Sequence, residues 1–168
     1  MKSFWTSLLL FAALFLVCGC AAQSGSLDAA KLEYSETRLL GILAALESKD
    51  KAEVLKLFSE TALQVNDNID EEVDEMMAFY EGTHGFYEGN LMVEIQLQEN
   101  ANKVVNGKYW VATETDEYLI CFTDQVIDDN PLNVGLSSIQ VVKESDLANE
   151  SEWRIIGDES LSKSELWP

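Results

Sequence analysis

The spacing of apolar residues changes near Gly82, and this change limits the folds that the chain can adopt. Before Gly82, apolar residues recur at helical spacing, as in the stripe of Leu39, Ile42, Leu43 and Leu46. After it, apolar and polar residues alternate, as along "LMVEIQLQ" at 91–98, which is typical of a half-buried strand. Helices followed by strands predict an α+β fold, with N-terminal helices packed on one face of an antiparallel sheet.

Helix-capping and helix-ending residues divide the helical part of the chain into separate helices. Asp50 and Glu53 resemble a capping box, which predicts that a short second helix starts at Asp50. Gly82 is a natural helix stop. We therefore expect three helices. The first covers residues 28–49, the second is short and starts at Asp50, and the third covers residues 68–81.

Turn signals divide the second part into strands. Asn106-Gly107 predicts a hairpin turn, and Asp116 predicts a tight turn between two further strands. The stretch "EGTHGFYEG" at 81–89 predicts a loop that exposes His84, the single histidine. The strands are expected at 91–98, 108–115, 117–123, 136–143 and 153–157.

The two central strands look partly apolar on both faces, although an ordinary antiparallel sheet leaves one face to water. Along 108–115, Tyr109 lies on one side and Trp110 on the other; along 117–123, Tyr118 opposes Leu119. We expect something to cover the second face: the C-terminal tail, a second copy of the chain, a protein partner or a small-molecule ligand. The candidate binding residues are Tyr109, Trp110, Tyr118 and Leu119.

The chain begins with the layout of a secretory signal. Lys2 precedes an apolar run over 4–17 that is short for a membrane span, and small residues follow. The stretch "LVCGC" at 16–20 resembles the lipobox of bacterial lipoproteins. That resemblance implies cleavage after Gly19 and a diacylglyceryl group on Cys20, and two acyl chains anchor a protein stably. Plain secretion and an uncleaved helix are the alternatives.

These expectations give a domain map and a location. Residues 1–19 are a lipoprotein signal peptide, residues 20–27 are the lipidated cysteine and a tether, and residues 28–168 are a single α+β domain. The implied location is extracytoplasmic, with the lipid anchored to the outer face of the cell membrane.

The charge of the chain restricts its partners. Eleven basic and 30 acidic residues give a formal net charge of −19, and loss of 1–19, which has one basic and no acidic residue, makes it −20. Nucleic acids and anionic lipids require basic patches, so neither is an expected partner. Cys121 lies in the apolar run "YLICFT", which predicts a buried thiol.

Several strings together resemble a family of uncharacterised lipoproteins from Gram-positive gut bacteria, whose domain is similar to the cone of nuclear transport factor 2. The resemblance implies a curved sheet over about 39–157 but no assigned activity. The strings are "LFSETAL" (57–63), "IDEEVDEMMAFYEG" (69–82), "YWVATETDEYLICF" (109–122) and "DDNPLNVGLSSIQVV" (128–142).

No motif in the sequence predicts a catalytic residue, a metal site or a cofactor. Asp116 and Asp128 have the context of turn formers, and the acidic run at 66–75 lacks the glycine of a calcium loop. We therefore expect a non-enzymatic module that binds a ligand or partner. The alternatives are a cone-fold isomerase, dehydratase or hydrolase with an Asp base and Tyr109 or Tyr118 as donor, and a homodimerisation module.

Overall fold

The computed structural model describes residues 22–89, 95–97, 103–149, 152 and 154–157. The chain divides into two units, Met1–Tyr34 and Ser35–Pro168, and all the packing described below lies within the second. The helices are α2 (Ala22–Ser48), α3 (Lys51–Leu55), α4 (Glu60–Val65) and α5 (Ile69–Phe79), with 3-10 turns η1 (Pro131–Asn133) and η2 (Glu144–Asp146). The strands are β1 (His84–Gly89), β2 (Ile95–Leu97), β3 (Lys103–Thr113), β4 (Glu117–Ile127), β5 (Gly135–Lys143) and β6 (Arg154–Gly157).

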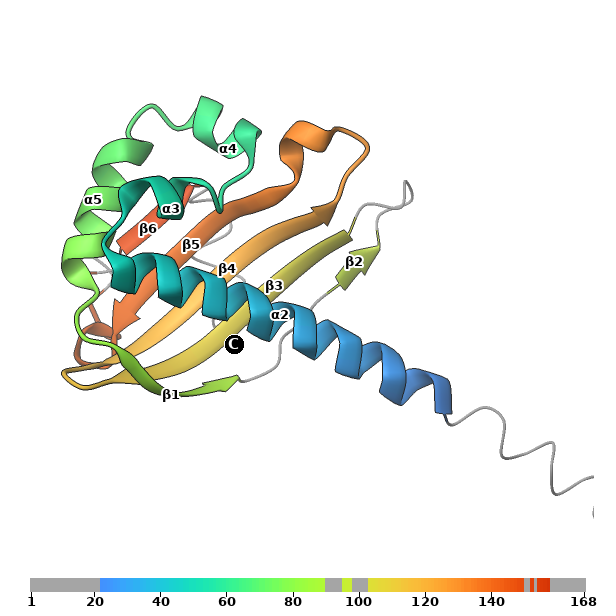
Figure 1. Cartoon of the computed structure of the whole chain (residues 1–168), viewed down its shortest axis with the longest axis horizontal. Helices are drawn as coiled ribbons and strands as arrows, with labels where there is room; N and C mark the ends of the chain where they lie inside the picture. The colour runs from blue at the N-terminus through green and yellow to red at the C-terminus, as the bar shows by residue number, and fades with distance from the viewer. Residues whose placement is uncertain (1–21, 90–94, 98–102, 150–151, 153, 158–168) are drawn as a thin grey trace, which may run out of the picture. The chain divides into compact units, whose positions relative to one another are not determined.

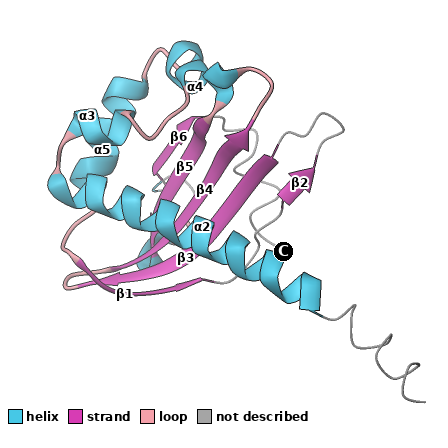
Figure 2. Cartoon of the chain, turned by 45° about the vertical axis from the view of Figure 1, so that its right-hand side comes forward, coloured by secondary structure: helices cyan, strands magenta, loops and turns pink. Residues whose placement is uncertain are grey.

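The six strands form one antiparallel sheet in the order β1-β3-β4-β5-β6, and β2 also pairs with β3. Within the second unit, the helices lie on one face of this sheet, with residues 35–48 of α2 running across the strands (Figures 1 and 2). This arrangement confirms the predicted α+β fold.

Local capping explains where the short helices begin. The Asp50 carboxylate accepts a hydrogen bond from the Ala52 amide at 2.9 Å, which confirms a helix start at Asp50. In the same way, the Ser59 hydroxyl accepts from the Ala62 amide at 3.1 Å and starts α4. Helix α2 begins at Ala22, six residues before the predicted start, because extending an existing helix costs far less than starting one.

Two predictions about the strands were wrong. The stretch at 81–89 is not a loop: helix α5 ends at Phe79 with Tyr80 as its C-cap, Gly82 follows with a φ of 84°, and β1 occupies His84–Gly89. Asn106-Gly107 is not a turn either, because β3 runs straight through it. Gly107 lies opposite Phe122, and a β-carbon on Gly107 would stand 2.2 Å from the Phe122 ring. Only a residue without a side chain leaves enough space for this ring. Of the predicted strand at 91–98, only Ile95–Leu97 lies within the described residues, and it is β2.

The sheet is apolar on both faces, as the alternation predicted. The face toward the helices contributes Tyr109, Tyr118, Ile120 and Phe122 to the main core, against the stripe on α2. The other face, which we call the outer face, has its own buried cluster of Leu119, Cys121 and Val142, with Trp110, Leu147 and Ile155 packed against it.

Candidate functional site

The four predicted binding residues do not form one site. Tyr109 and Tyr118 lie in the main core and are 2% and 0% exposed. Trp110 and Leu119 are directly opposed across β3 and β4 on the outer face. The sheet therefore brings Trp110 and Leu119 together and separates both from the two tyrosines.

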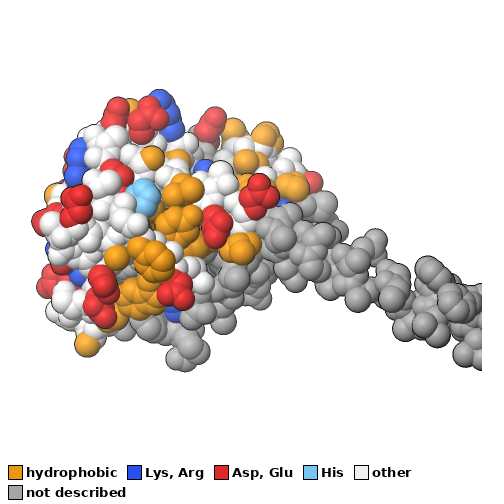
Figure 3. Space-filling model, turned by 60° about the horizontal axis from the view of Figure 1, so that its bottom comes forward, with side chains coloured by type: hydrophobic (Ala, Val, Ile, Leu, Met, Phe, Trp, Pro, Cys, Tyr) orange, Lys and Arg blue, Asp and Glu red, His pale blue; other side chains and the backbone are white. Residues whose placement is uncertain are grey.

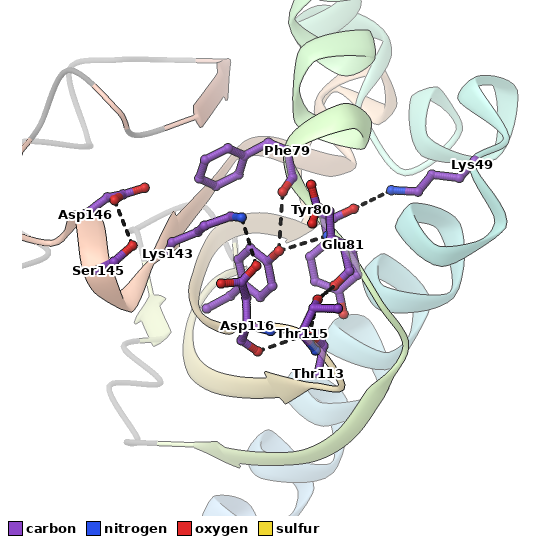
Figure 4. Close-up of polar contacts among 11 residues, drawn as sticks. Lys49, Phe79, Tyr80, Glu81, Thr113, Thr115, Asp116, Lys143, Ser145 and Asp146 are labelled. Carbon is purple, nitrogen blue, oxygen red and sulfur yellow. Dashed lines mark hydrogen bonds and ion pairs between the residues drawn. The ribbon is translucent and has the colours of Figure 1, made fainter.

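Both tyrosine hydroxyls are held by structural hydrogen bonds. Tyr109 donates to the Ser35 hydroxyl at 2.7 Å. Tyr118 accepts from the Glu81 amide at 2.9 Å and donates to the Phe79 carbonyl at 3.3 Å (Figure 4). Burial raises the pKa of Tyr109 and the pKa of Tyr118, which disfavours the charged phenolate of each. Neither hydroxyl is available to a ligand in this arrangement.

Asp116 belongs to the same structural network. Its carboxylate accepts from the Lys143 ammonium at 2.8 Å, and this hydrogen bond raises the pKa of Lys143 (Figure 4). The ammonium also lies 5.5 Å from the Phe79 ring centroid and 5.8 Å from that of Tyr118. Because the Thr113 amide donates to the Asp116 carbonyl at 2.9 Å, Asp116 closes the predicted tight turn as well.

One buried ion pair links helix α2 to the sheet, and the sequence reasoning missed it. Asp124 is 0% exposed, and its carboxylate receives Arg38 Nε at 2.6 Å and a second guanidinium nitrogen at 3.2 Å. The core-facing alternation of Tyr118, Ile120 and Phe122 continues to Asp124, which was the available signal. An acidic residue at a core position requires a partner.

His84 is also not the exposed loop residue that the sequence predicted. Its Nδ1 lies 2.7 Å from Glu47 Oε1, and the same oxygen accepts from the His84 amide at 2.8 Å. The Tyr80 hydroxyl is 3.4 Å away from that oxygen. The three residues join the end of α2 to the start of β1, and 37 positions separate Glu47 from His84, so no local pattern could reveal the pair.

A pocket of about 240 Å³ opens on the outer face beside Trp110. Two residue pairs across β1 and β3 form its floor, Glu88 opposite Trp110 and Phe86 opposite Ala112. Phe86 is 62% exposed, which is unusual for a large apolar side chain. Figure 3 shows the β1 side of the molecule, where hydrophobic side chains gather with carboxylates on both sides. The pocket is lined by Phe86, Glu88, Trp110, Val111, Ala112, Glu117 and Glu144.

Two buried polar atoms on the outer face make no hydrogen bond with the described part of the chain. They are the side-chain oxygen of Asn106 and the amide nitrogen of Gln140, which is 5% exposed. Most buried polar groups in native proteins have partners, so an unpaired atom of this kind requires an explanation. Both side chains lie on the same face as Trp110, because they alternate with the core-facing residues of β3 and β5.

A second pocket, of about 700 Å³, lies at α4, η1 and the ends of β4 to β6. Its polar side chains bond to one another: Thr61 donates to Asn133 at 2.6 Å, and Asn66 donates to Glu72 at 2.6 Å. Asp128 accepts from the Asn130 amide at 2.8 Å, as expected of a turn former. These groups hold the surrounding loops together, which leaves them less suited to a ligand than the groups beside Trp110.

The remaining predictions concern cysteine, metal and membrane. Cys121 is buried, and desolvation raises the pKa of its thiol to about 12, which disfavours the reactive thiolate. Within the described residues, no three His, Cys, Asp or Glu side chains group closely enough to hold a metal ion. None of the described helices has the length and apolar character to cross a membrane. Cys20 lies outside the described residues.

Comparison with known proteins gives a family but no activity. Among curated proteins, no sequence matches the chain. Residues 41–144 match a domain of unknown function, DUF5104, and this segment holds α3 to β5 together with the Trp110 pocket. Because the match covers more than half of the 168 residues, the chain belongs to the DUF5104 family.

Proposed function

We propose that the chain is an exported bacterial lipoprotein, anchored through Cys20 to the outer face of the cell membrane, whose domain binds a small molecule. The lipobox-like "LVCGC" supports the anchor. The helices on one face of an antiparallel sheet are compatible with a cone like that of nuclear transport factor 2, as the resemblance implies.

The pocket beside Trp110 is the observation that carries the binding function. It combines a half-buried indole and an exposed phenyl ring with an opening to solvent, which is the usual composition of a ligand site.

An enzyme of the cone type would need a carboxylate and a donor that are free to reach a substrate. Asp124 is held by Arg38, and the hydroxyls of Tyr109 and Tyr118 are bonded to neighbours within the core. Binding therefore accounts for the available groups better than catalysis does.

The anchor is tested by replacing Cys20 with serine in the full chain. We expect loss of lipid labelling, together with release of the protein or a block in its processing, because serine offers no sulfur to acylate. Cys18→Ser is the matched control and should keep the label. A mature-sized Cys20→Ser protein that stays in the membrane would contradict the anchor.

The binding function is tested by native mass spectrometry of the full chain purified from its own membrane in non-ionic detergent. We expect a small-molecule adduct that disappears in Trp110→Ala and persists in Leu132→Ala, which removes a 41% exposed leucine at η1. Absence of an adduct, or an adduct that survives Trp110→Ala in a folded protein, would contradict the proposal. A dimer that Trp110→Ala dissociates would assign the outer face to self-association instead.

A further inference from the structure

We propose that the pocket beside Trp110 takes an organic cation, specifically an alkylammonium group, as its ligand. This inference rests on the proposed binding function and adds the chemical class of the ligand. It follows from two aromatic side chains and three carboxylates that five separate positions of the fold bring to one small opening.

The aromatic part of the pocket consists of Phe86 and Trp110. Phe86 pairs with Ala112 and Glu88 pairs with Trp110, so the two rings are diagonal neighbours on the same face of β1 and β3. Diagonal neighbours are close enough for large side chains to bound a common space. An indole attracts cations more strongly than the other aromatic rings, and aromatic cages are a recurrent solution for quaternary ammonium groups.

The carboxylates surround this aromatic floor from three elements. Glu88 comes from β1, Glu117 from the start of β4 and Glu144 from η2. None of the three forms an ion pair with a lysine or arginine of the described segments. Lys108 lies two residues before Trp110 on β3, opposite Cys121, and is not among the residues that line the pocket. The lining of the opening therefore contains three carboxylates and no basic side chain.

The size and composition of the pocket distinguish between kinds of cation. A metal ion requires several oxygen ligands converging on one point, and no such group occurs within the described residues. An alkylammonium group is larger and partly apolar, so it can contact the rings while its charge is balanced from the rim. A pocket of about 240 Å³ suits a group of that kind.

The test uses choline chloride as probe and the full chain in non-ionic detergent, with tryptophan indole nitrogens labelled. The Trp110 signal is identified as the one that vanishes in Trp110→Leu. We expect choline to shift this signal at constant ionic strength, whereas its neutral carbon analogue 3,3-dimethylbutan-1-ol should bind at least tenfold more weakly. Equal binding of the two compounds would overturn the inference that the pocket selects a cation, although it would still show that the pocket binds a small molecule.

Variants separate a specific site from general attraction to an acidic protein. Glu88→Gln with Glu117→Gln should weaken choline binding several-fold, and Glu60→Gln with Glu71→Gln, which removes the same charge from α4 and α5, should leave it unchanged. Trp110→Leu should weaken it about tenfold, measured by dialysis with labelled choline. Equal effects of the two glutamate pairs, or no response to choline, would overturn the inference. A native adduct that still depends on Trp110 would leave the proposed function standing in either case.

Discussion

Replacing Arg38 with alanine should destabilise the domain by about 3 kcal/mol, because it strands the buried carboxylate of Asp124 without its bidentate partner. Urea-induced unfolding followed by circular dichroism measures the change. Arg38 is partly exposed at the side-chain level, 24%, so the guanidinium keeps some water while the carboxylate has none. Most of the cost therefore comes from Asp124.

The double replacement Arg38→Met with Asp124→Leu is the informative control. Apolar side chains in place of both charges remove the desolvation cost along with the attraction, so the double variant should be closer in stability to the original protein than Arg38→Ala is. A loss below about 1 kcal/mol for Arg38→Ala would show that the ion pair has no structural role.

Gly107→Ala should destabilise the domain by about 1 to 3 kcal/mol, because the new methyl group would stand 2.2 Å from the buried Phe122 ring. Phe122 is 2% exposed and its ring stacks on Tyr109, so it has little room to move. Thermal or urea unfolding measures the loss. A smaller side chain at position 122 should restore part of it, so Gly107→Ala with Phe122→Leu should lose less than the two single changes added together.

Gly41→Ala is the matched control for Gly107→Ala. A β-carbon at Gly41 meets nothing within 4 Å, and the residue lies inside α2. Alanine should therefore stabilise the protein by about 0.4 to 1 kcal/mol. Opposite signs at Gly41 and Gly107 would locate the effect in packing, whereas equal losses would contradict the explanation given for Gly107.

The pattern of apolar residues was sufficient to predict the fold class and most of the strands, because burial of one face depends on local periodicity. The prediction was wrong at Asn106-Gly107. This dipeptide is typical of hairpin turns, but here the glycine leaves space for the ring of Phe122, which is 15 positions away in the sequence. It failed at 81–89 because glycines at 82, 85 and 89 hide the alternation of β1. In both cases the deciding contact is made by another strand.

The candidate site was predictable only in part, for the same reason. Alternation placed Trp110 and Leu119 on the face away from the tyrosines, and the register of β3 with β4 agrees. Phe86 and Glu88 could not be added, because they reach Trp110 through a strand that the sequence did not reveal. The pairs Glu47–His84 and Arg38–Asp124 join residues 37 and 86 positions apart, beyond any local pattern.

The register shift in β1 has a consequence for self-association of the protein. Strand β1 pairs with β3 at one end of the strand order, and its register shifts between His84 and Phe86. A long regular edge is a template on which neighbouring molecules add strands and aggregate. An edge strand with a register shift, on a chain of net charge −19, opposes such growth both by its irregular geometry and by electrostatic repulsion between molecules.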